Sequence, residues 1–136
     1  MRLETRARSR ALQAVYAWDL RGEQELERVS NQIFDDLLVP AEERTLAVML
    51  LRTLREHGRE LDALLSEVTT NWRLERLGVI ERCVLRLAAA ELHRGDTPPR
   101  VVLRESIRLA ERYGSPESAK FVNGVLDALA RKMGRL

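Results

Sequence analysis

The 136-residue sequence has little cysteine, aromatic residue, proline or glycine, and each shortage excludes a class of protein. A single cysteine, Cys83, excludes an internal disulfide and any metal site built from several cysteines. Four prolines and seven glycines are too few for the frequent turns of a many-stranded β fold. Because aromatic residues make up only 4%, the core must consist mainly of Leu, Val, Ile and Ala.

Long apolar runs are also missing. No stretch approaches the ~20 apolar residues of a membrane-spanning helix. Residues 1–11 are charged and no apolar run follows them, so no secretory signal peptide is expected. With 45% hydrophobic and 32% charged residues, the sequence predicts one globular domain over residues 1–136, in a cytoplasmic protein without a membrane association.

Charge is distributed unevenly along the chain, although the formal net charge is only +2. Residues 1–21 and 97–136 are rich in arginine and lysine, whereas residues 22–45 are mostly acidic. If the two basic ends lie together in the fold, they form one positive patch.

Apolar residues recur at helical spacing along the whole chain, which predicts an all-α protein of about seven helices. The expected segments are residues 5–20, 23–38, 41–68, a short turn at 72–77, 79–93, 100–113 and a last helix from 116. In the second segment Leu26, Val29, Ile33 and Leu37 share one face, which is expected to be the core face. His57 and Cys83 are interpreted as core residues, because no other ligand lies nearby in the sequence.

The last helix has a clear start and one unusual residue. Gly114 is placed to end the preceding helix, Ser115 to cap the exposed N–H groups, and Pro116 to occupy the first turn. Gly124 lies inside the helix at a cost of roughly 1 kcal/mol, so we expect another element to approach it closely. Lys120 lies near the helix start, where an anion can interact with the N–H groups and the helix dipole.

Two sets of arginines are spaced so that they share a helix face. Arg2, Arg6 and Arg10 are four residues apart with Arg8 between them, and residues 100–112 carry a ladder of Arg100, Arg104, Arg108 and Arg112. Guanidinium groups pair with phosphate oxygens, so both sets are candidates for nucleic-acid binding. A solvated amphipathic face is the simpler interpretation of either set alone, and both interpretations stay open.

No catalytic arrangement emerges from the sequence. There is no glycine-rich phosphate loop, no metal-ligand cluster, and no Ser, Cys or Thr with a histidine nearby in sequence. The sequence therefore predicts a binding protein that has no enzymatic activity, no cofactor and no metal.

Three segments of the chain carry recognisable motifs: residues 8–16 (RSRALQAVY), residues 77–88 (LGVIERCVLRLA, with Glu91 and Leu92 after it) and residues 120–127 (KFVNGVLD). They resemble the NusB family of transcription antitermination factors. The segments fall in order at the start, middle and end, so the resemblance covers essentially the whole chain, and residues 120–127 carry the most specific motif.

The resemblance implies a fold of two small packed helical bundles, with subdomains of about residues 1–68 and 69–136. It implies binding of the boxA element of ribosomal RNA leader transcripts together with a small-subunit ribosomal protein called NusE, within the RNA polymerase antitermination complex. The implied RNA contacts are Arg6, Arg8, Arg10, Tyr16, Tyr113, Glu117, Lys120 and Phe121, whereas Glu75 and Glu81 would face NusE. Glu117 stands where the family often has Asp, and Tyr113 where Phe also occurs.

Two other functions stay open at this point. A related helical domain forms the RNA-binding part of certain ribosomal-RNA cytosine methyltransferases, but a chain that ends at Leu136 leaves no room for a catalytic domain. A helical adaptor that binds only proteins would use the arginines for solvation alone. A homodimer that masks the RNA surface is also compatible with the sequence.

Overall fold

Helices make up most of the described residues, and no strand occurs among them. The structure is a computed structural model that describes residues 2–22, 24–69 and 77–136. Its helices are α1 (Leu3–Arg21), α2 (Leu26–Asp36), α3 (Ala41–Val68), α4 (Val79–Arg94), α5 (Pro99–Tyr113) and α6 (Pro116–Lys132). The all-α class is confirmed. Of the predicted turn at 72–77, all but Leu77 lies outside the described residues.

The junction of α5 and α6 forms as the sequence predicts. The Gly114 N–H donates to the carbonyl of Ala110 at the end of α5, over 2.9 Å. Ser115 then caps α6, with its hydroxyl oxygen accepting from the backbone N–H of Ser118 at 3.1 Å, and Pro116 occupies the first turn. These predictions are confirmed. The Ser115 cap and Pro116 define where α6 starts.

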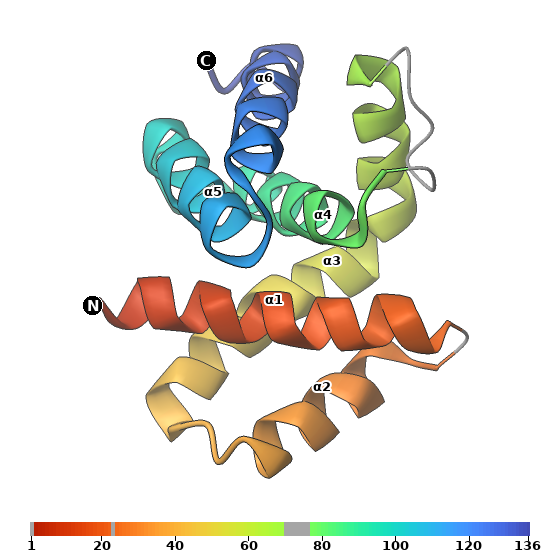
Figure 1. Cartoon of the computed structure of the whole chain (residues 1–136), viewed down its shortest axis with the longest axis vertical. Coiled ribbons are helices and arrows are strands. Elements are labelled where there is room, and N and C mark those ends of the chain that lie inside the picture. The colour runs from red at the N-terminus through yellow and green to blue at the C-terminus, as the bar shows by residue number, and fades with distance from the viewer. Residues whose placement is uncertain (1, 23, 70–76) are drawn as a thin grey trace.

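Helix α1 lies across the middle of the molecule (Figure 1). It packs against α2 and α3 on one side and against α4 on the other, while α5 packs on α6. The long helix α3 contacts α1 and α2 of the first predicted subdomain, and it also contacts α4 and α6 of the second. The division into subdomains at about residue 68 stays a prediction.

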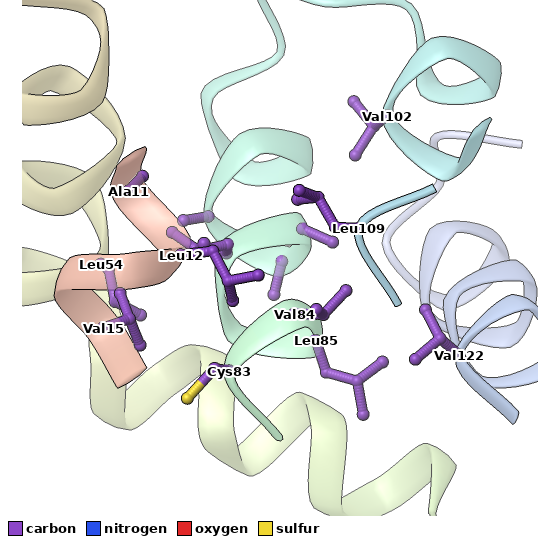
Figure 2. Close-up of a cluster of buried hydrophobic side chains, with 14 of the residues drawn as sticks. Ala11, Leu12, Val15, Leu54, Cys83, Val84, Leu85, Val102, Leu109 and Val122 are labelled. Atoms are coloured by element: carbon purple, nitrogen blue, oxygen red, sulfur yellow. The ribbon is translucent and has the colours of Figure 1, made fainter. Parts of the chain in front are cut away.

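One buried cluster of aliphatic side chains joins the helices. Figure 2 shows its centre, where Val15 of α1 lies beside Leu54 of α3, with Val84 of α4, Leu109 of α5 and Val122 of α6 farther along the same core. Cys83 of α4 is fully buried in this cluster, as expected, and burial raises the pKa of its thiol to about 12. The face that each helix buries in this core determines which of its side chains are left on the surface, where they can bind a partner.

Two expectations about packing were wrong. Leu37 is 44% exposed, whereas Phe34 is completely buried, because α2 ends at Asp36 and Leu37 lies in the turn that follows. Gly124 is exposed, and a Cβ atom there would meet nothing within 4 Å, so no element approaches it closely. His57 is half-buried, and its ring lies 4.2 Å from that of His93, a neighbour that sequence spacing does not reveal.

None of the described helices combines the length and the apolar character needed to cross a membrane. Within the same residues, no group of three or more His, Cys, Asp or Glu side chains is arranged to hold a metal ion.

Candidate nucleic-acid interface

Arg6 and Arg10 form a positive surface of α1 above a buried carboxylate. Their Nε atoms lie 2.6 and 3.3 Å from the two oxygens of Glu43, which comes from the first turn of α3. The Glu43 side chain is only 6% exposed, whereas those of Arg6 and Arg10 are 42% and 31% exposed. The hydrogen bond from Arg6 lowers the pKa of Glu43, and the bond from Arg10 adds to the effect. Two guanidiniums over one carboxylate leave a net positive charge that faces solvent.

Arg8 has a different environment, although it lies between the other two. Its guanidinium donates to both oxygens of Glu91 on α4, at 2.9 and 2.6 Å, and to Glu105 on α5 at 3.3 Å. All three side chains are at most 10% exposed. Burial by itself lowers the pKa of Arg8, but the hydrogen bonds and charges of the glutamates outweigh it and raise the pKa above its usual value. Arg8 therefore joins α1, α4 and α5.

The arginine-rich half of α1 meets the junction of α5 and α6. The hydroxyls of Ser9 and Tyr113 share a hydrogen bond, and Thr5 donates to Glu105 at 2.5 Å. The two basic regions thus meet along α5 and at its last residue, Tyr113, whereas the C-terminus lies at the far end of α6 (Figure 1).

The remaining predicted RNA residues surround this junction on α1 and α6. Glu117 and Lys120 are exposed on the first turns of α6, and Phe121 is half-buried against the core. Tyr16 is 39% exposed and lies two turns beyond Ser9, so it shares the side of α1 that meets Tyr113. The exposed cation of Lys120 and three partly exposed aromatic rings therefore lie around this junction, a combination that suits single-stranded RNA.

Glu81 lies at the start of α4 and contacts α6. Its Oε1 accepts a hydrogen bond from the Ser118 hydroxyl at 2.5 Å. Its Oε2 lies 2.2 Å from the point that a Cβ atom of Gly78 would occupy, so a larger residue at position 78 would displace this carboxylate. Glu75, the other predicted partner contact, lies outside the described residues.

Comparison with known proteins identifies the family. The family model described as the NusB family matches residues 5–131. The chain belongs to the NusB family. It is 45% identical over 126 residues to the transcription antitermination protein NusB of Anaeromyxobacter dehalogenans, which covers 93% of this chain and 89% of the relative.

Solved NusB structures share the fold over nearly the whole chain. NusB of T. maritima has a TM-score of 0.86 and 35% identity, covering 94% of this chain and 90% of that one. A crystal structure of the antitermination factors NusB and NusE in complex with double-stranded RNA has a TM-score of 0.88 and 30% identity, covering 97% and 98%.

The segments that resemble NusB proteins combine packing with surface residues. In the motif of residues 120–127, Val122, Val125 and Leu126 are buried, whereas Lys120 and Asn123 are exposed. The motif therefore fixes the position of α6 in the core and, at the same time, presents its first turns to solvent.

The pairing of three buried carboxylates with the arginines of α1 was not expected from the sequence. Glu43, Glu91 and Glu105 are each at most 7% exposed. A signal existed for Glu91, which stands between Ala90 and Leu92 in the most apolar helix, where a charged residue normally needs a partner.

Proposed function

We propose that this chain is a transcription antitermination factor that binds RNA jointly with the ribosomal protein NusE, and that the RNA element is boxA. Membership of the NusB family supports the role, because relatives at 45% identity carry the name of a transcription antitermination protein. A NusB structure of the same fold was solved with NusE and double-stranded RNA. The role is one of binding, without catalysis, in the RNA polymerase complex in the cytoplasm.

One observation carries the RNA site. The Ser9–Tyr113 hydrogen bond holds the arginine-rich half of α1 against the end of α5, directly before the cap of α6. In the proposal Arg6, Arg10 and Lys120 attract the phosphates, while Tyr16, Tyr113 and Phe121 provide rings on which bases stack. Glu117 borders this surface on α6.

Arg8 has a positioning role in this proposal. Its guanidinium donates to Glu91 and Glu105 and is nearly buried, so a phosphate would have to displace two carboxylates to reach it. We infer that Arg8 fixes the orientation of α1, and that Arg6 and Arg10 contact the RNA.

NusE is proposed to dock at the start of α4, at Glu81 and Glu75. The Glu81 carboxylate is held by Ser118 at the start of α6, directly after the Ser115 cap. A partner that binds Glu81 would therefore contact the same junction as the RNA, which explains physically why the two would bind jointly.

A fluorescence titration with boxA RNA, with and without purified NusE, tests the proposal. We expect tight, boxA-selective binding only with NusE present, and a steep loss of affinity as salt rises. Binding that is equal for a scrambled RNA, or absent under both conditions, would refute it.

Lysine variants on one helix provide a matched comparison. Lys120→Gln is expected to weaken RNA binding, because Lys120 lies on the proposed surface. Lys132→Gln removes the same charge at the other end of α6, where Lys132 pairs with Glu67 at 2.7 Å, and should leave RNA binding unchanged. Equal effects of the two variants would mean that only the overall charge matters.

A further inference from the structure

A groove with a volume of about 500 Å³ separates the start of α1 from α5. Residues of both helices line it, and most of them are basic or polar: Arg2, Thr5, Arg8, Ser9, Arg104, Glu105, Arg108, Leu109 and Arg112. Three members of the arginine ladder on α5 thus face the arginine-rich end of α1, although about a hundred residues separate them in sequence. Arg100, the fourth member of the ladder, does not line the groove.

The charge in this groove is largely uncompensated. Its one acidic residue, Glu105, is 6% exposed and already accepts from Arg8 and Thr5. Arg108 reaches Glu105 only at 3.4 Å, and its side chain is 65% exposed. Within the described part of the chain, the side chains of Arg2, Arg104 and Arg112 have no carboxylate partner. This sets them apart from Arg6, Arg8 and Arg10.

The spacing of the arginine ladder is suited to a polyanion whose charges are regularly spaced. Residues four apart on a helix are separated by about 6 Å along its axis and face nearly the same way. Like charges at this spacing repel each other and reduce helix stability, so the row has a cost that a bound polyanion would remove. Among the described residues that line the groove there is no aromatic ring, so they offer contacts to phosphates and none for stacking.

The groove is continuous with the proposed RNA site. Ser9 lines the groove and also hydrogen-bonds Tyr113, and the Arg112 guanidinium lies 5.4 Å from the centre of the Tyr113 ring. An RNA strand that contacts Tyr113 would therefore reach the groove directly.

We propose that this groove binds the phosphate backbone of the RNA next to the boxA element, through Arg104, Arg108, Arg112 and Arg2, without reading its sequence. This inference rests on the proposed RNA-binding function and extends the contact surface along α5. The groove supplies affinity and salt dependence, whereas the junction of α5 and α6 supplies the selectivity.

A triple variant tests the proposal. Arg104→Gln, Arg108→Gln and Arg112→Gln are combined, and RNA affinity is measured with NusE present over a series of salt concentrations. Each phosphate contact to a single strand contributes about 0.7 to the slope of log K against log salt. Loss of three contacts should therefore reduce the slope by about 2, and the affinity at 0.1 M salt by roughly 100-fold. The ratio of boxA to scrambled affinity should stay the same.

Arg100→Gln is the matched control, because it removes the same charge from the same helix outside the groove. It should leave the salt slope unchanged. Thermal unfolding of the triple variant should occur at the wild-type temperature or slightly above it, since the exchanged side chains are exposed and their mutual repulsion is removed.

The outcomes separate this inference from the proposed function. A wild-type chain that binds no RNA refutes both. A wild-type chain that binds boxA, with a triple variant of unchanged slope, refutes the groove and leaves the proposed function intact. A reduced boxA selectivity in the triple variant would show that α5 reads bases, which also contradicts the proposal.

Discussion

Arg8 stabilises the fold through two buried carboxylates. Replacing it by Gln leaves Glu91 and Glu105 buried without their cation, which costs about 3–5 kcal/mol of unfolding free energy. The exposed pair of Arg131 and Asp127 is the control, because Arg131→Gln should cost less than about 0.5 kcal/mol. Urea unfolding measures both. An Arg8→Gln variant with wild-type stability and lost RNA affinity would instead make Arg8 a direct RNA contact.

Asp19 links stability to pH at a second ion-pair cluster. Its oxygens accept from Arg82 at 2.5 Å and Arg86 at 3.0 Å, and the hydrogen bond from Arg82 lowers its pKa. A carboxyl group with a lowered folded-state pKa stabilises the fold above its unfolded pKa of about 3.9, and loses this effect as pH falls through the folded value.

Asp19→Asn is therefore expected to lower the unfolding free energy by about 1–3 kcal/mol at pH 7. The difference from the wild type should be constant above about pH 5 and should shrink below about pH 4, where Asp19 becomes protonated in the unfolded wild-type chain before it does so in the folded one. Urea titrations over this range measure it. Asp36→Asn, on the exposed side of α2, should show no such difference. A difference that grows as the pH falls would contradict the assignment.

For single residues, the sequence shows which side chains could bind phosphate, but it does not show which of them are buried in the fold. Arginines at positions 6, 8 and 10 look equivalent in sequence, but Glu43 and Glu91 are 37 and 83 residues away from their partners. Because only the tertiary fold brings these carboxylates to α1, spacing cannot separate a surface arginine from a buried one.

Gly114, before α6, and Gly124, in the middle of α6, should respond in opposite ways to the same substitution. Gly114→Ala would place a Cβ atom 2.8 Å from the Ala110 carbonyl oxygen, and we expect a loss of about 1–3 kcal/mol. Gly124→Ala adds a better helix former in open space, and we expect a gain of about 1 kcal/mol. Thermal unfolding compares them directly. If Gly124→Ala instead lowered the stability, this would support the expectation from sequence that another element approaches Gly124 closely.

The elements themselves are predictable because their signals are local. Ser115, Pro116 and Gly114 define the α5–α6 junction through contacts within a few residues. The prediction failed at Leu37 because the expected segment, residues 23–38, ran two residues past the end of α2 at Asp36.

On the scale of the whole molecule, the packing of α1 creates the candidate site. Helix α1 crosses the molecule and brings its first turns against α5 (Figure 1). The all-α class follows from periodicity, and the family follows from the motifs. The α1–α5 groove does not follow from either, because it depends on a crossing between helices that are about a hundred residues apart.

Backbone NMR of the isotope-labelled protein, titrated with boxA RNA in the presence of NusE and compared with NusE alone, tests the central claim most directly. The account predicts that RNA-dependent shift changes concentrate in the first half of α1, in α5 from Arg104 onward and at residues 113–121. The acidic helix α2 should remain unchanged. RNA-dependent changes confined to α2 and the first turns of α3 would contradict the claim that RNA binds where α1 meets the α5–α6 junction.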